Sequence, residues 1–182
     1  MKKILLLLIA GIFCFASKAQ TIDLVTNGQS AYTIVVPAKP TTMEVKAAMV
    51  LQDYLRRISG KELPLRPDDQ PQREQEILIG RVQRAVMQEL SLKELSEDGV
   101  WIKTAGKKLL ITGGTRKGVL YGVYTFLEKY LDCRKYASDL TVVPKRKSIT
   151  LNAINDKQLP AFTYREVFYN DAYNQEYMDW HK

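Results

Sequence analysis

The sequence predicts an α/β (α+β) fold in which two main helices pack on a mixed β-sheet. Three observations predict this fold. Two segments carry apolar residues at the helical period, short β-branched or apolar runs alternate with them, and one pair of runs has the pattern of a hairpin. Elements that interleave in this way form a mixed sheet with helices packed on it.

The first strand leads directly into the first main helix. Residues 31–37 contain a β-branched run and end at a proline, which stops a strand. Thr41 and Glu44 then have the spacing of a capping box, which starts a helix. Gly60 is expected to end that helix. Its apolar stripe consists of Ala47, Leu51, Tyr54 and Ile58.

The middle of the chain is expected to hold a loop, a strand and a weaker helix. Residues 66–75 contain no apolar member and predict a surface loop. Residues 76–80 form a short run with the apolar Ile77-Leu78-Ile79 at its centre, as an interior strand does. A weaker helical pattern covers residues 82–90.

A hairpin and the second main helix come next. Residues 99–104 and 107–112 alternate in the strand period on either side of Ala105-Gly106. The turn at Gly113-Gly114 leads into a helix, with Thr115 as the expected cap. Two short strands, 140–143 and 148–151, are expected to close the domain. The stripe of the second helix consists of Val119, Val123, Phe126 and Tyr130.

Residues 1–19 have the pattern of a cleavable signal peptide. Two lysines precede an apolar run at residues 4–15, and Ser17 and Ala19 occupy the positions before a cleavage site. The run is about twelve residues long, whereas a spanning helix needs roughly twenty. Lipidation at Cys14 would require a small residue before it, and Phe13 stands there. We therefore expect cleavage after Ala19, a periplasmic or secreted protein, and no membrane span in the mature chain.

Charge and cysteine content argue against a nucleic-acid partner and against a disulfide in the mature chain. Removing the leader takes three lysines and no acids, so the formal charge of +7 becomes 24 minus 20, or +4. The basic residues are spread along the chain, which predicts a solvated surface rather than a nucleic-acid partner. Cys133 is the one cysteine outside the leader, so an intrachain disulfide is excluded there.

The C-terminal segment has a different character. Residues 152–160 are turn-like, residues 162–169 have a strand pattern, and residues 170–182 show no cap or closing element. We expect a domain at 20–152, followed at 153–182 by a junction and the first strand of a (β/α) barrel that is otherwise missing. The segment is rich in aromatic side chains, which need a partner to bury them. They are Phe162, Tyr164, Phe168, Tyr169, Tyr173, Tyr177 and Trp180.

The residue types present do not predict an active site. His181 is the one histidine, so neither a metal site nor a histidine-dependent nucleophile is expected. The pairs Asp68-Asp69 and Glu74-Glu76 lie in the polar loop and are expected to be solvated. The turn at residues 113–118 lacks the pattern of a P-loop and predicts close helix–sheet packing. No catalytic residue, metal or cofactor is therefore expected.

Three stretches together resemble a known module. They are Asp98-Gly99-Val100-Trp101-Ile102-Lys103, Lys108-Leu109-Leu110-Ile111-Thr112-Gly113-Gly114, and the helix from Arg116 to Glu128 with its Gly-Val-Leu-Tyr-Gly start. The chain resembles the non-catalytic amino-terminal α/β domain of family 67 α-glucuronidases and family 20 β-hexosaminidases. It also resembles related exported bacterial proteins in which a domain of unknown function follows this module. The resemblance covers about residues 30–152 and the junction.

The junction adds one candidate site residue. The stretch Pro160-Ala161-Phe162-Thr163-Tyr164-Arg165 is similar to the opening of the first barrel strand in the hexosaminidases. The resemblance implies that Arg165 binds sugar hydroxyls, and the alternative is an arginine that makes an ordinary ion pair. A guanidinium presents a planar fork of donors that suits paired oxygens.

The resemblance implies an accessory domain of an exported glycoside hydrolase that acts in glycan breakdown. The family's catalytic carboxylates lie further along the barrel, so the domain would be inactive alone and would meet carbohydrate through the missing barrel. The alternative is a free-standing carbohydrate-binding or protein-interaction module that uses the aromatic tail as its surface.

Overall fold

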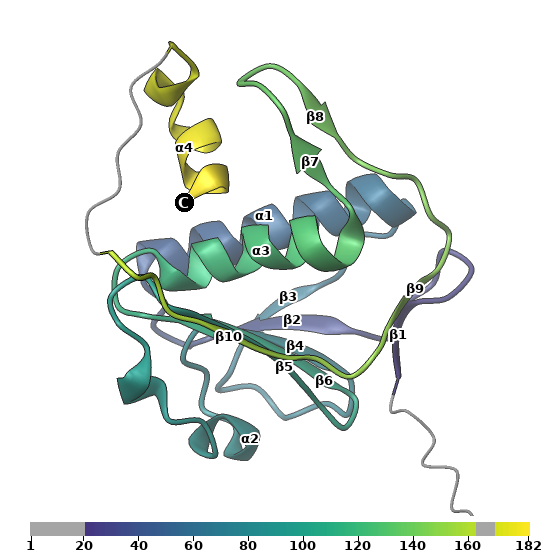
Figure 1. Ribbon diagram of the computed structural model, residues 1–182. Coiled ribbons are helices and arrows are strands. Elements are labelled where there is room, and N and C mark those ends of the chain that lie inside the picture. The colour runs from purple at the N-terminus through teal and green to yellow at the C-terminus, as the bar shows by residue number, and fades with distance from the viewer. Residues whose placement is uncertain (1–20, 163–169) are drawn as a thin grey trace, which may run out of the picture.

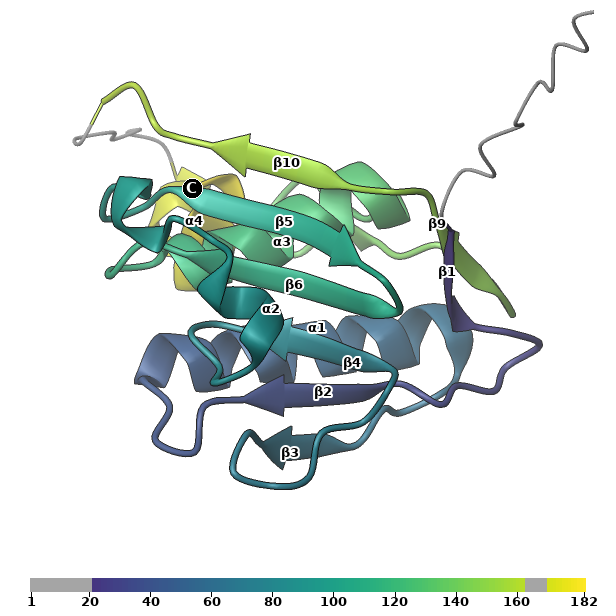
Figure 2. The same ribbon diagram turned by 90° about the horizontal axis from the view of Figure 1, so that it is seen from below.

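The computed structural model describes residues 21–162 and 170–182, in which two helices cover one face of a six-stranded sheet (Figure 1). The sheet order is β10-β5-β6-β4-β2-β3. Helices α1 (Thr42–Ser59) and α3 (Gly118–Leu131) lie side by side on one face, and the short helix α2 (Ala85–Gln88) lies on the other (Figures 1 and 2). This arrangement confirms the predicted fold class. The leader and most of the strand expected at 162–169 lie outside the described residues.

The sheet is mixed, and its two predicted central features are confirmed. Strand β4 (Glu76–Ile79) is interior and runs parallel to β2 (Thr33–Val36) and to β6 (Lys108–Gly113). Strand β5 (Val100–Ala105) pairs antiparallel with β6 as the expected hairpin. Alternate side chains of these strands, with Ile34, Ile77, Ile79 and Ile111 among them, join the main core beneath the helices.

Helix α1 begins and ends as predicted. The Thr41 hydroxyl accepts from the Glu44 amide at 3.2 Å, and the Glu44 carboxylate accepts from the Thr41 amide at 2.8 Å, which completes the capping box. At the other end Gly60 has φ of 79°, a left-handed conformation that favours glycine. The buried face carries the predicted stripe, including Leu51, Tyr54 and Ile58.

Helix α3 lies very close to the sheet because glycines line its start. A Cβ on Gly118 would overlap the carbonyl oxygen of Gly99, and one on Gly122 would lie 3.0 Å from Ile111 Cγ2. The predicted cap is wrong: the helix begins at Gly118, its N-cap residue is Lys117, and no side chain caps it. Backbone hydrogen bonds hold the turn before this helix instead: Gly114 N donates to Gly99 O at 2.8 Å.

Several small elements differ from the sequence prediction. The loop expected at 66–75 begins with β3 (Leu65–Pro67), which pairs parallel with β2 at the sheet edge. The helix expected at 82–90 shortens to α2 and is followed by the 3-10 turn η1 (Leu92–Glu94). The strand expected at 140–143 is β8 (Thr141–Val142), which pairs with β7 (Arg134–Lys135) in a separate hairpin.

One end of the domain is closed by a second small sheet. Strand β9 (Ile149–Leu151) confirms the strand expected at 148–151 and pairs with β1 (Ile22–Val25), which the sequence analysis missed. Across residues 21–162 and 170–182, we find no helix of the length and apolarity needed to span a membrane.

The C-terminal segment is where the sequence prediction fails most. Residues 155–158 are not turn-like but form β10 (Asn155–Gln158), an edge strand that pairs with β5. The turn η2 (Asn170–Tyr173) and helix α4 (Gln175–His181) follow, and α4 does have a cap, because Asn174 Oδ1 accepts from Tyr177 N at 2.9 Å. Helix α4 lies on the outer side of the helix layer (Figure 1).

Candidate functional site

The residue nominated for substrate binding, Arg165, lies in the stretch 163–169, outside the described residues. The histidine considered for catalysis is held by a backbone group, because His181 Nε2 lies 3.1 Å from the carbonyl oxygen of Lys135. Among residues 21–162 and 170–182, no group of histidine, cysteine and acidic side chains could hold a metal ion. The remaining candidates for chemistry are the two most deeply buried carboxylates, those of Glu76 and Asp179.

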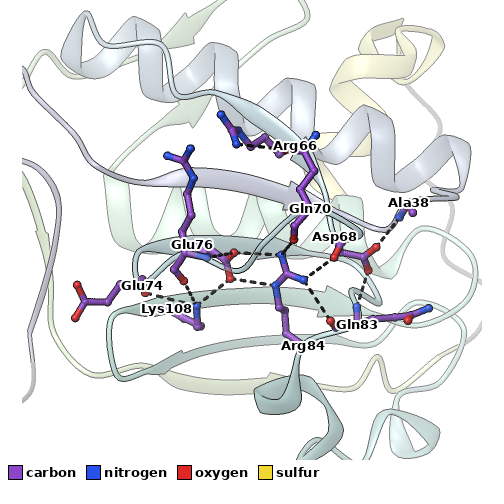
Figure 3. Close-up of polar contacts among 10 residues, drawn as sticks. Ala38, Arg66, Asp68, Gln70, Glu74, Glu76, Gln83, Arg84 and Lys108 are labelled. Atoms are coloured by element: carbon purple, nitrogen blue, oxygen red, sulfur yellow. Dashed lines mark hydrogen bonds and ion pairs between the residues drawn. The ribbon is translucent and has the colours of Figure 1, made fainter.

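The first buried carboxylate is Glu76, on the face of the sheet opposite α1 and α3 (Figure 3). Lys108 Nζ lies 2.9 Å from its Oε2, and Arg84 approaches both carboxylate oxygens at 3.3 Å. The Arg73 amide donates to Oε1 at 2.9 Å. Both cations are themselves largely buried, so Glu76 is the centre of a compact ionic cluster.

This cluster ties the loop after β3 to the start of α2. Arg84 also donates to the carbonyl oxygens of Asp68, at 2.6 Å, and Gln70, at 3.2 Å. The Asp68 carboxylate accepts from the amides of Ala38, at 2.8 Å, and Gln83, at 2.6 Å. Figure 3 shows Arg84 pointing into the loop between these groups. Asp68 and Glu76 were expected to be solvated, and that prediction is wrong because both carboxylates replace water with protein donors.

The electrostatics of Glu76 do not suit acid catalysis. Burial alone would raise the pKa of Glu76, but hydrogen bonds from the Arg73 amide, Lys108 and Arg84 outweigh it and hold the pKa below its ordinary value. A general acid needs a raised pKa so that it carries a proton near neutral pH. Glu76 is therefore ionised near neutral pH and serves as a structural group.

The second buried carboxylate, Asp179, anchors α4 to the helix layer. Lys46 Nζ of α1 lies 2.6 Å from its Oδ2, and Lys117 Nζ, just before α3, lies 2.7 Å from its Oδ1. Gln175 Nε2 donates to Oδ1 at 2.9 Å. Burial alone would raise the pKa of Asp179, but hydrogen bonds from the two lysines and their charges hold it below its ordinary value.

An aromatic slot lies beside this ionic contact. The Trp180 ring is buried between Tyr54 of α1, with centroids 5.5 Å apart, and Tyr124 of α3, with centroids 5.0 Å apart. Tilted ring pairs at such distances are favourable beyond the area they bury. The Tyr124 hydroxyl is desolvated strongly enough to raise its pKa. The aromatic tail was expected to need a partner beyond the preceding domain, but Trp180 finds its partners within it.

A partly apolar groove of about 560 Å³ runs along α1 beside this slot. Val45 and Met49 line it and are exposed, with Met49 59% accessible. Lys46, Arg57 and Glu176 place charges along the same groove. Exposed apolar side chains bordered by charges are typical of a protein-interaction surface.

Sequence reasoning missed both ionic centres for a physical reason. Glu76 opens a strand in a polar context, and only the parallel pairing of β4 with β6 brings Lys108 beside it. Asp179 meets cations that are 133 and 62 residues away. One local signal was available: Tyr177 and Trp180 have the three-residue spacing of one helix face, and Asp179 lies beside them.

Comparison with known proteins places the fold. The sequence profile described as the glycosyl hydrolase family 67 N-terminus matches residues 20–126, more than half of the chain. No curated protein matches the chain. A family GH20 β-N-acetylhexosaminidase from Streptomyces coelicolor A3(2) has a similar fold, with a TM-score of 0.53 at 13% identity over 81% of this chain and 26% of that one.

A family GH115 4-O-methyl-α-glucuronidase with specificity for decorated arabinogalactans is also similar. Its TM-score is 0.51 at 14% identity, over 75% of this chain and 18% of that one. The chain thus spans about a quarter or less of these enzymes, and at such identities the likeness shows the fold alone. The resemblance drawn from the sequence is confirmed by the profile match. The chain belongs to the glycosyl hydrolase family 67 N-terminus family.

Proposed function

We propose that this chain is the amino-terminal accessory domain of an exported glycoside hydrolase, of α-glucuronidase or β-hexosaminidase type, that acts in glycan breakdown. The observation that carries the proposal is the family match over residues 20–126. The match begins directly after the expected cleavage site at Ala19, which supports export of the mature domain.

A non-catalytic role is supported by the state of the buried acids. Glu76 and Asp179 both have a pKa below the ordinary value, and each is surrounded by cations. Neither carboxylate is poised to give or take a proton at a bound sugar. Catalysis would then require residues of a following barrel, and Arg165 would contribute a guanidinium that binds sugar hydroxyls there.

The helix layer is the surface that we propose contacts this following domain. The groove along α1 exposes Val45 and Met49, and α4 rests on the same side of the molecule (Figure 1). The alternative role, a free-standing sugar-binding module built on the aromatic tail, is less well supported, because Tyr177 and Trp180 are buried and, of the tail's described aromatic side chains, Phe162 and Tyr173 are left exposed.

The proposal is tested by activity and by the downstream gene sequence. The purified chain should not hydrolyse aryl glucuronides or aryl N-acetylhexosaminides above background, whereas the product of a longer reading frame that encodes a barrel should. In that longer protein, Arg165→Lys should weaken turnover because a lysine cannot present the planar fork. Turnover by the chain alone that survives repurification, and that disappears in an Asp179→Asn variant shown to be folded by circular dichroism, would contradict the proposal.

Export has its own test. Mass spectrometry of the periplasmic or secreted protein should find an amino terminus at Gln20. An intact Met1, or a lipid on Cys14, would contradict the expected processing.

A further inference from the structure

Cations that are dispersed in the sequence gather at one end of the helix layer. Helix α1 ends with Arg56 and Arg57, and Lys61 follows its C-cap. The segment 145–147, Lys-Arg-Lys, crosses this end, because Arg146 N donates to Ile58 O at 2.9 Å and Lys145 Nζ donates to Arg57 O at 2.7 Å. This end of α1 and α3 lies at the right in Figure 1, near β9.

The end of α3 adds a third source of positive charge. Arg134 follows α3 and donates to the carbonyl oxygen of Cys133 at 2.8 Å. All three sources of charge lie close enough to the Cys133 thiol to affect its pKa. Burial raises this pKa to about 11, although the charges of Arg57, Arg146 and Arg134 act to lower it. We call this surface the basic end, formed by residues 56, 57, 61, 134 and 145–147.

Helix capping accounts for only part of the basic end. Lys145 and Arg134 donate to carbonyls near the helix ends, and cations there also complement the helix dipoles. Asp53 pairs with Arg56 at 2.5 Å and with Arg57 at 3.7 Å, and Asp132 pairs with Arg146.

Other cations of the basic end have no structural task. The ammonium groups of Lys61 and Lys147 make no ion pair or hydrogen bond with any described residue, and Lys147 is exposed. The acids that pair with these cations are Asp53 and Asp132, and with the exposed Glu62 next to Lys61 they are three against seven cations. Like charges held together repel one another, so their concentration does not stabilise the fold.

We propose that the basic end binds an acidic polysaccharide, one that carries carboxylate or sulfate groups along its length. Arginine matches such groups bidentately, and the spread of cations over the ends of two helices suits an extended polyanion. The surface is open, and only Arg57 of these cations also borders the groove along α1. The choice of a polysaccharide rests on the proposed function, whereas binding of a polyanion rests on the charge arrangement alone.

Binding of the purified chain to four probes tests this inference. The probes are dextran, dextran sulfate, polygalacturonate, and vesicles that contain anionic phosphatidylglycerol. The backbone of dextran sulfate is that of dextran, so this pair isolates charge. We expect dextran sulfate and polygalacturonate to bind at low salt and to weaken steeply as salt rises, and dextran not to bind.

A matched pair of triple variants separates the basic end from net charge. Arg56→Gln, Lys61→Gln and Lys147→Gln together should weaken polygalacturonate binding roughly tenfold or more, since each cation removed loses a charge contact. The control combines Lys39→Gln, Lys93→Gln and Lys107→Gln, which removes the same charge from exposed sites elsewhere and should change binding by less than about threefold. Circular dichroism should show both triple variants folded.

Three results would overturn the inference. Equal losses in the two triple variants would mean that net charge alone drives binding. Absence of binding to both acidic polymers would show that the basic end is not a polyanion-binding site. Tighter binding to vesicles than to polygalacturonate, lost in the basic-end variant, would assign the surface to a membrane. None of these results bears on whether a longer protein hydrolyses glycosides, so failure here is distinguishable from failure of the proposed function.

Discussion

Two regions of this domain use the same chemistry, a buried carboxylate between two cations, for different ends. Glu76 lies on the sheet face away from the main helices and joins Arg84 and Lys108, which are 8 and 32 residues away. Asp179 lies on the helix side and joins Lys46 and Lys117, which are 133 and 62 residues away. The first centre joins segments within the sheet domain: strands β4 and β6, the loop after β3 and the start of α2. The second centre attaches the distant C-terminal helix α4 to this domain.

The difference in solvation explains what each centre can do. The cations around Glu76 are buried, with side-chain exposures of 7% for Arg84 and 12% for Lys108. Those around Asp179 are 39% exposed for Lys46 and 34% for Lys117. A buried cation that loses its partner stays desolvated and unpaired, which is costly, whereas a partly exposed lysine can be solvated by water. We call the sheet-side centre the lock, because we expect its ions to stay paired in the folded domain near neutral pH. We expect the helix-side centre to let α4 detach while the rest of the domain stays folded.

Breaking the lock should have the largest effect. Glu76→Gln leaves Arg84 and Lys108 without a counter-charge in a buried place, so we expect the free energy of unfolding to fall by about 3–5 kcal/mol. Denaturant unfolding followed by circular dichroism measures the loss. Glu74→Gln, on a neighbouring exposed carboxylate, is the matched control and should leave the unfolding midpoint unchanged. A tolerated Glu76→Gln would mean that the lock does not stabilise the domain.

Emptying the aromatic slot should have the next largest effect. Trp180→Ala removes the ring between Tyr54 and Tyr124. The usual cost of a buried aromatic-to-alanine change, about 3–5 kcal/mol, is an upper limit because α4 can undock first. We expect a loss of about 2–3 kcal/mol, with faster hydrogen exchange confined to residues 170–182.

The indole nitrogen gives this prediction a sharp control. Trp180 Nε1 is buried and finds no acceptor among the described residues, so its N–H contributes no hydrogen bond there. Trp180→Phe keeps an aromatic ring and removes the unpaired donor, and it should cost much less than the alanine variant. Equal losses from both variants would show that ring packing is not what holds α4.

Loosening the ionic contact of α4 should have a smaller effect. In Asp179→Asn the amide can no longer pair with two lysines, yet Lys46 and Lys117 can be solvated, so we expect a loss of about 1–2 kcal/mol. Hydrogen exchange of the α4 amides should rise while that of β4 and β6 stays as in the wild type. Asp139→Asn, on an exposed carboxylate that makes no ion pair or hydrogen bond with a described residue, removes the same charge and should leave α4 protected. Uniform loss of protection over the sheet would show that Asp179 stabilises the whole domain, as the lock does, and does not only attach α4.

The sequence predicts the parts of the fold whose signals are local. The capping box of α1, the hairpin of β5 and β6, and the glycines of α3 each depend on residues within a few positions of one another. Strands β1 and β10 were missed because their pairing energy comes from partners far along the chain, as Ile22 opposite Leu151 and Asn155 opposite Lys103 show.

The same rule explains the errors at the candidate sites. A loop made wholly of polar residues is predicted to be solvated. The sequence around it does not reveal that the buried Arg84 guanidinium donates to the Glu76 carboxylate and to the Asp68 carbonyl oxygen. The aromatic tail was expected to be buried by a partner, and this holds for Tyr177 and Trp180 but not for Phe162 and Tyr173, which are exposed. A pattern of apolar residues also cannot say whether the partner lies within the domain. Here the partners of Trp180 are two tyrosines on the helices beneath it.

The finest distinction between the two centres should appear in the pH dependence of stability. Both carboxyl groups have a folded pKa below the ordinary value, 4.5 for Glu76 and 3.8 for Asp179. The unfolded chain therefore binds protons that the folded one does not, and each contribution is complete above the ordinary pKa and is lost as the pH falls through the folded pKa. Between pH 7 and low pH, the unfolding free energy should fall less steeply than in the wild type, from about pH 5 downward in Glu76→Gln and only from a lower pH in Asp179→Asn. Curves for both variants that fall in parallel with the wild type would show that neither carboxylate is held ionised by its cations.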